Sequence, residues 1–209
     1  MADYAGAIKR PFQDIKKLLI GTVLGMIPIV NLLVSGYLVD SAKKTMKKKA
    51  ELPEWENWGD LFIKGIMVTL IGFIYMIPAI IVLGAGIWSI VIAALAAGTL
   101  TATTIAGAIA GGSIILLSGI LLLFLTVFII PMALMSYVDE GNLIDAFAVR
   151  DILKKVFTGQ YIMAWLVMSV VYMILSPIIL ILPVVGLGMY SFIAGVISFT
   201  IFAEVYKEV

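Results

Sequence analysis

Five lysines within seven positions carry the clearest chemical potential in this chain. The cluster consists of Lys43, Lys44, Lys47, Lys48 and Lys49. An ammonium group near a membrane surface is attracted to anionic lipid by roughly 1 kcal/mol. Like charges this close are costly to hold together unless a negative surface screens them, so contact with anionic lipid headgroups is one interpretation. The other is that the lysines only orient the protein in the membrane.

An acidic and aromatic stretch follows the lysines, with the sequence Leu52-Pro53-Glu54-Trp55-Glu56-Asn57-Trp58. Trp55 and Trp58 suit the headgroup region, where an indole ring lies in apolar surroundings and its N–H stays hydrated. The carboxylates Glu54, Glu56 and Asp60 could form an acid–base pair or hold a cation. We favour a solvated interfacial loop and assign no catalytic residue.

Several kinds of chemistry are disfavoured by composition. The chain contains no histidine and no cysteine, which removes the usual zinc ligands, thiol chemistry and the commonest general base. A formal net charge of +1 argues against nucleic-acid binding, which needs a concentrated basic surface. We therefore expect no metal site, no cofactor, no nucleic-acid partner and no enzymatic activity.

The charged residues are segregated from the rest of the chain, 63% of which is hydrophobic. Residues 1–17, 40–64, 138–158 and 204–209 contain all 14 basic and all 13 acidic side chains. A charge at the centre of a bilayer costs at least ~2.5 kcal/mol, so the charge-free segments between these patches belong in hydrocarbon. The pattern predicts a single multi-pass domain in the cell membrane.

Three charge-free segments result. Residues 18–39 contain Pro28 and Asn31 near the middle, which allows either one kinked span or a re-entrant hairpin. Residues 65–137 are long enough for two long tilted spans or three ordinary ones. Residues 159–203, with Pro183 near the middle, fit a hairpin of two spans.

The polar patches have distinct expected roles. The segments 1–17 and 138–158 contain amphipathic stretches that we expect to lie along the membrane surface. Residues 40–64 form the basic and aromatic loop, and 204–209 form a short tail. Because every Lys and Arg lies in a patch, the positive-inside rule places all four on the cytoplasmic side and gives three hairpins. A rival layout splits 65–137 into spans at 65–84, 86–110 and 112–137, and places residues 138–158 outside.

Small and polar residues mark further candidates inside the charge-free segments. Gly98, Ala102, Ala106 and Ala110 recur every four residues, a spacing that permits close helix packing within the chain or between copies. Isolated polar residues could line a solute path, although single hydroxyls in membrane helices usually bond a neighbouring carbonyl. They are Asn31, Tyr75, Ser89, Thr126, Tyr172 and Ser176.

A family resemblance rests on a few of these segments. It is carried by Gly36-Tyr37 before the lysines, the stretch from Leu52 to Phe62 with Gly65, and Ala146-Phe147 to Arg150. With these residues the chain resembles a largely archaeal family catalogued as domain of unknown function 4013. The resemblance implies an archaeal integral membrane protein, and it assigns no activity and no functional residue.

The predicted fold is all-α: a polytopic helical membrane bundle with interfacial amphipathic helices. The predicted function is a membrane-organising or interaction subunit whose partners are anionic membrane lipids and a second copy or another membrane protein. The alternative is a small transporter or channel for an uncharged or lipidic solute, which would need a water-accessible cavity reaching the bilayer midplane. An intramembrane enzyme is third.

Overall fold

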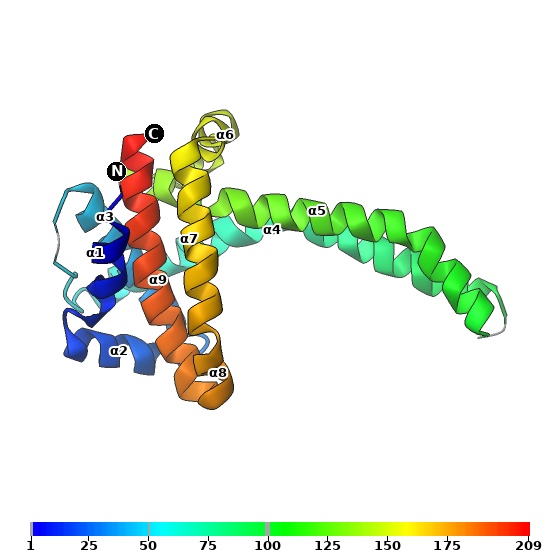
Figure 1. Cartoon of the computed structure of the whole chain (residues 1–209), viewed down its shortest axis with the longest axis horizontal. Helices are drawn as coiled ribbons and strands as arrows, with labels where there is room; N and C mark the ends of the chain where they lie inside the picture. Colours follow the sequence, from blue (N-terminus) through cyan, green and yellow to red (C-terminus); the bar gives the residue numbers. More distant parts are fainter. Residues whose placement is uncertain (1, 50, 99–100) are drawn as a thin grey trace. The chain divides into compact units, whose positions relative to one another are not determined.

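The computed structural model describes residues 2–49, 51–98 and 101–209, and these residues form helices and no strands (Figure 1). About 85% of the chain is helical. The elements in chain order are α1 (Tyr4–Lys9), η1 (Arg10–Phe12), α2 (Ile15–Gly25), α3 (Asn31–Met46), α4 (Trp58–Ala96), α5 (Ala102–Glu140), η2 (Leu143–Phe147), α6 (Val149–Val156), α7 (Gly159–Leu175), α8 (Pro177–Ile181) and α9 (Pro183–Glu208).

Within the described residues, four helical stretches are long and apolar enough to cross a membrane: 58–96, 102–140, 159–181 and 183–208. A bilayer core of about 30 Å needs roughly 20 apolar helical residues, which each stretch supplies. The prediction of an all-α, multi-pass membrane protein is confirmed.

The segment predicted at 18–39 contains a helical turnaround. Helix α2 has 11 residues, or about 16 Å at 1.5 Å per residue, which is too short to cross a bilayer. The chain turns at residues 26–30, around Pro28, and returns as α3. Helix α3 continues to Met46, beyond the boundary expected at residue 39, because lysines in its last turn complement the negative end of the helix dipole.

The segment predicted at 65–137 forms two helices. Helices α4 and α5 contain 39 residues each. The breaks required by the three-span layout, near residues 85 and 111, fall inside these helices. Each helix also contains a proline, Pro78 or Pro131, a residue that membrane helices tolerate when neighbouring groups bond the freed carbonyl.

The chain divides into two compact units, one made of residues 1–71 and 131–209 and the other of residues 72–130. All charged side chains belong to the first unit. The second unit holds the C-terminal part of α4 and the N-terminal part of α5, and its outward-facing side chains are largely isoleucine and leucine. Such a surface suits lipid.

Within the second unit, α4 and α5 approach each other at glycines. A Cβ at Gly86 would lie 2.8 Å from a Leu116 methyl, and one at Gly119 would lie 2.8 Å from a Leu83 methyl. A Cβ at Gly112 would overlap Ile90. Ala108 is buried on the same face of α5. Small residues thus allow this contact, as is usual in membranes.

The four-residue series proposed for close packing does not form this contact. Ala102, Ala106 and Ala110 are exposed, and Gly98 lies two residues beyond the end of α4 with a φ of +68°. At 100° per residue, Ala110 lies about 200° around α5 from Gly112, so it points away from α4. The expectation of a contact within the chain is therefore corrected; contact between copies stays a prediction.

In the first unit, α9 is the central helix. It packs against α1, η1, α2, α3, α7 and α8, and Figure 1 shows it between α7 and the N-terminal helices. Phe192 and Val196 of α9 share a buried cluster with Val34, Tyr37 and Leu38 of α3. The α9 residues from Phe192 to Val205 are nearly all buried.

Helix α3 also touches α4 at backbone distance. A Cβ at Gly36 would overlap the Leu61 carbonyl, and one at Gly65 would overlap the Leu32 carbonyl. The two pairs run in opposite directions, so these segments cross antiparallel. Gly25 and Gly188 make a similar approach between α2 and α9. Such contacts need residues without side chains.

The close contact with α3 makes Gly65 more sensitive to an added methyl group than Gly72, another glycine of α4. We expect Gly65→Ala to destabilise the protein by roughly 1 to 3 kcal/mol because the methyl overlaps backbone that cannot turn away. Gly72→Ala is the matched control, since nothing lies within 4 Å of its Cβ position. Thermal unfolding in detergent measures both. Equal stability of the two variants would mean that α3 and α4 are farther apart than described.

The hairpin arrangement predicts one side for every charged patch. Since the chain has no cysteine, single cysteines at Lys48, Asp145 and Lys207 can be labelled specifically. A membrane-impermeant thiol reagent added to intact cells should leave all three unlabelled and should label them after lysis. External labelling at Asp145 alone would contradict the arrangement, because an even number of crossings separates it from Lys48.

Candidate functional site

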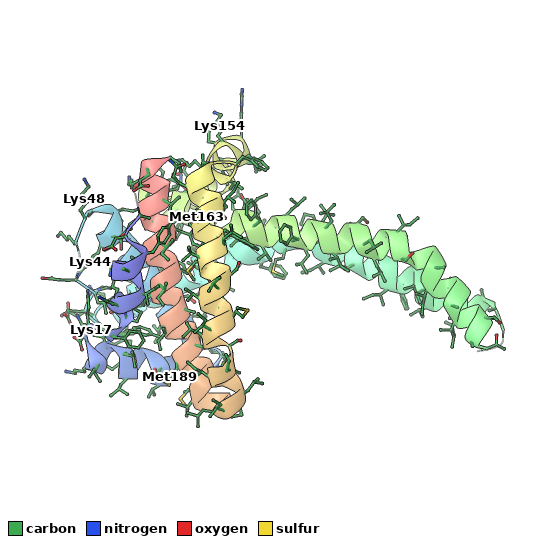
Figure 2. The ribbon with its side chains drawn as sticks, in the orientation of Figure 1. Lys17, Lys44, Lys48, Lys154, Met163 and Met189 are labelled. Atoms are coloured by element: carbon green, nitrogen blue, oxygen red, sulfur yellow. The ribbon has the colours of Figure 1, made fainter. Side chains whose placement is uncertain are left out.

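The five lysines of the predicted site have two different roles in the structure. Four lysines are exposed at the end of α3 and just after it: Lys43, Lys47, Lys48 and Lys49. Figure 2 shows Lys48 projecting away from the helices. Lys44 is partly buried, and its Nζ donates to the Leu52 carbonyl at 3.2 Å. Lys44 therefore holds the following loop, and the other four remain at the surface.

A Schellman turn ends α3. The Lys49 N–H donates to the Lys44 carbonyl at 2.9 Å, and the Lys48 N–H donates to the Thr45 carbonyl at 2.8 Å. Lys48 adopts a φ of +56°. Glycine is the usual residue at this position, because a side chain there costs about 1 to 2 kcal/mol. Beyond the turn, residues 51–57 run along the N-terminal helices, where Leu52 and Trp55 contact Lys17.

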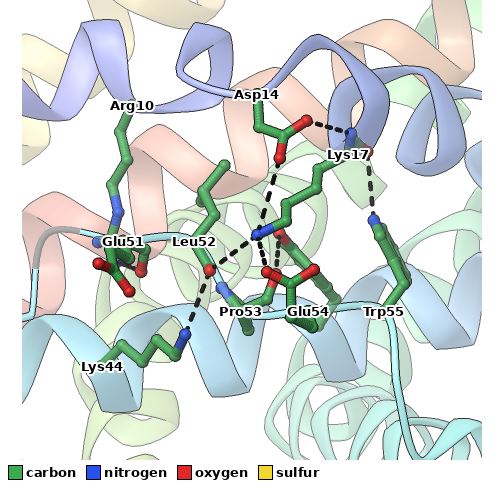
Figure 3. Close-up of polar contacts among 10 residues, drawn as sticks. Arg10, Asp14, Lys17, Lys44, Glu51, Leu52, Pro53, Glu54 and Trp55 are labelled. Atoms are coloured by element: carbon green, nitrogen blue, oxygen red, sulfur yellow. Dashed lines mark hydrogen bonds and ion pairs between the residues drawn. The ribbon is translucent and has the colours of Figure 1, made fainter.

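The loop after the lysines is fixed by a second lysine (Figure 3). Lys17 Nζ donates to the same Leu52 carbonyl at 3.2 Å and to Glu54 Oε1 at 2.6 Å. In return, Trp55 Nε1 donates to the Lys17 carbonyl at 3.3 Å. The loop is thus held from α2 and from α3 at once.

The predicted interfacial anchors differ in exposure. Trp55 is half-buried and stacks on Tyr37, with ring centroids 4.1 Å apart; the Tyr37 hydroxyl donates to the Pro53 carbonyl at 3.0 Å. Trp58 stacks on Trp55 at 5.9 Å and is 46% exposed. Trp58 is therefore accessible to a membrane interface, and Trp55 mainly packs the loop against α3.

The carboxylates of this region are mostly engaged by lysines. Glu54 pairs with Lys17. Asp60 pairs with Lys64 at 2.5 Å, and Lys64 also reaches Asp40 at 2.5 Å. Among the described residues, no group of three or more acidic, histidine or cysteine side chains is placed to hold a metal ion.

Arg10 is the one charged residue that is almost completely buried within the described ranges, with 4% of its surface exposed. Its Nη1 donates to Thr45 Oγ1 and, at 3.0 Å, to Thr200 Oγ1. Its Nη2 lies 3.3 to 3.5 Å from three carbonyls: Ser41, Lys49 and Glu51. The guanidinium therefore joins η1, α3, the loop and α9.

The electrostatics of Arg10 are unusual for a buried charge. No carboxylate of residues 2–49, 51–98 or 101–209 lies within ion-pair distance of it. Burial lowers the pKa of Arg10, and the more distant Glu204 opposes that effect. Since an arginine remains charged at physiological pH, a positive charge stays under this surface.

A cavity of about 630 Å³ opens beside Arg10. Its walls come from α1 and η1, from the end of α3 with the turn that follows, and from the last turns of α9. The basic residues that line it are Arg10, Lys48, Lys49 and Lys207, and the acidic ones are Asp3, Glu204 and Glu208.

Sequence reasoning missed Arg10, Lys17 and the cavity. In the sequence, both cations look like ordinary members of an interfacial patch. Only one signal was available: Arg10 precedes Pro11, and Asp14 precedes Ile15, an arrangement that favours two short helices rather than one. The buried location of Arg10 comes from α9, nearly 200 residues away.

Arg10→Met should destabilise the protein strongly. It would leave several buried oxygens without their donor, at ~1 to 3 kcal/mol for each orphaned group. We expect a loss of roughly 2 to 4 kcal/mol in the free energy of unfolding, measured by chemical or thermal unfolding in detergent. The neighbouring exposed Lys9→Met is the control and should have little effect. A wild-type stability for Arg10→Met would show that the hydrogen-bond network does not hold the unit together.

Comparison with known proteins identifies a family for this chain. No curated protein and no solved structure matches the chain. A family model described as "Protein of unknown function (DUF4013)" matches residues 19–185. That range covers most of the chain and includes the tryptophan loop, α4, α5 and α7. The chain belongs to the DUF4013 family.

Proposed function

We propose that this protein is a non-enzymatic subunit of the cell membrane that organises lipid or a membrane partner through a basic cytoplasmic surface. The surface consists of Lys43, Lys47, Lys48 and Lys49, with Trp58 exposed on the nearby loop. The observation that carries the proposal is that these four lysines are exposed and form no ion pair within the described ranges.

The contrast with neighbouring cations supports this assignment. Arg10, Lys17 and Lys44 are used to hold the fold, through bonds to carbonyls and to Glu54. The side chains of the four surface lysines form no ion pair within the described ranges. One of them, Lys48, has a positive φ, a backbone conformation that is unfavourable for lysine. Fold stability alone does not account for a lysine at position 48.

The expected strength of the interaction is substantial. At roughly 1 kcal/mol per residue, four ammonium groups would favour an anionic surface by about 4 kcal/mol, or roughly a thousandfold in the equilibrium constant. The attraction should weaken as salt rises, because the Debye length falls from about 10 Å at 0.1 M to about 3 Å at 1 M.

Helix α6 offers a second contact with the membrane surface. It buries Ile152 and Val156 against the protein and leaves Arg150 exposed. At its two ends, Val149 is 47% exposed and Phe157 is 71% exposed. Apolar side chains next to exposed basic ones are typical of helices that lie in the headgroup layer. Figure 2 shows Lys154 of this helix projecting outwards.

The test neutralises the surface lysines and spares Lys44. A variant with glutamine at positions 43, 47, 48 and 49 should lose most of the phosphatidylglycerol that copurifies with the wild type, and should lose its salt dependence. Its unfolding temperature should stay close to wild type because these side chains do not hold the fold. Copurified lipid is measured by mass spectrometry after washing at increasing salt.

The control neutralises two exposed lysines that lie outside both proposed contacts, with glutamine at Lys9 and Lys16. This variant should lose much less than half as much lipid as the first. Wild-type lipid retention in the first variant would leave the lysines with an orienting role only and would refute the proposed function.

A further inference from the structure

We propose that the cavity beside Arg10 binds a single phosphate group, carried by a lipid headgroup or present as free phosphate, through the ammonium groups of Lys48 and Lys49. This inference rests on the proposed function and makes it more specific. Of the four surface lysines, Lys48 and Lys49 line the cavity, whereas Lys43 and Lys47 lie outside it.

The cavity has a suitable size. Sites for small molecules typically enclose about 300 to 1,000 Å³, and this one measures about 630 Å³. The exposed side chain of Gln13 also lines it, whereas the hydroxyls of Thr45 and Thr200 already donate to the Ser41 and Val196 carbonyls. An amide N–H next to ammonium groups can donate to a phosphate oxygen.

The charges are distributed unevenly around the cavity. Lys207, on α9, is paired with Asp139 at 2.5 Å. On the acidic side, Glu204 Oε2 accepts from the Asp3 N–H at 2.7 Å, and Asp3 Oδ1 accepts from the Gly6 N–H at 2.9 Å. Lys48 and Lys49 have no ion-pair partner in the described ranges. The wall at the end of α3 is therefore the part of the cavity that an anion would approach.

The buried charge of Arg10 makes this wall of the cavity more attractive to an anion. Arg10 lines the cavity, is almost fully buried, and has a buried Nε with no hydrogen-bond partner in the part of the chain that the structure describes. Its terminal nitrogens already donate to protein oxygens, so it would not be the main phosphate ligand. Its charge acts at low dielectric, where electrostatic interactions are less screened than in water. The two lysines thus contact the anion, and Arg10 raises the local positive potential.

The backbone at Lys48 is an independent indication. A lysine in the left-handed conformation is less stable than glycine would be at the same position. Backbone strain of this kind is often found at functional sites. Here the strained residue is one of the two lysines that line the cavity. If a bound phosphate is the reason for lysine at this position, glycine should stabilise the fold and weaken binding.

The main experiment compares two double variants that remove the same charge. Phosphatidylglycerol is titrated into detergent-purified protein, and the first bound lipid is counted by native mass spectrometry. Lys48→Gln with Lys49→Gln should weaken binding of that lipid at least fivefold. Lys43→Gln with Lys47→Gln should change it less than twofold. Equal losses in the two variants would overturn the cavity site and leave the proposed function intact, whereas no loss in either would overturn both.

A single variant separates binding from folding. Lys48→Gly should raise the unfolding temperature by about 2 to 4 °C as the strain is relieved, and should still weaken binding of the first lipid. A higher unfolding temperature with unchanged lipid binding would overturn the role of Lys48.

The source of the phosphate is resolved by a second titration. Inorganic phosphate is compared with chloride at equal ionic strength, with thermal stabilisation as the readout. Stabilisation of the wild type that is lost in the Lys48, Lys49 variant identifies free phosphate as a ligand. If the variant loses lipid binding and phosphate does not stabilise the wild type, the ligand is a lipid headgroup. A variant that behaves as wild type in both titrations refutes the inference.

Discussion

The buried guanidinium of Arg10 is the interaction on which the first unit depends. It bonds to two threonines and three carbonyls that belong to α3, the following loop and α9. A buried charge is tolerated only when its hydrogen bonds are made, so these segments must come together around it. No carboxylate of the described ranges neutralises it at close range. The result is a fixed positive charge beneath a surface that also carries the exposed lysines.

Close backbone contacts set the distances between the helices. In lipid the hydrophobic effect does not drive helix association, so packing and hydrogen bonds decide which surfaces meet. Gly36 and Gly65 bring α3 onto α4, and Gly25 with Gly188 brings α2 onto α9. With α3 fixed in this way, its C-terminal turn lies beside α1 and the last turns of α9. The cavity is a consequence of that arrangement.

The lysine cluster shows how one stretch of sequence serves two purposes. Lys44 and the distant Lys17 donate to the same carbonyl, Leu52, and hold the tryptophan loop in place. The exposed lysines around them are then presented on a rigid support. A rigid support reduces the ordering cost of binding, which makes a basic surface more effective than a mobile basic tail of equal charge.

The sequence by itself determined that this protein lies in a membrane and that it is helical. Charge is excluded from hydrocarbon wherever the chain folds, so the charge-free segments, the helical class and the surface position of most lysines could be predicted. Tertiary structure decided the rest. A four-residue repeat does not say which face of a helix meets a partner, and α4 meets α5 at Gly112 and Gly119 rather than at Ala102 and Ala106. Likewise, nothing local distinguishes Arg10 and Lys44 from surface cations, because their oxygen partners come from distant segments that only the folded chain brings together.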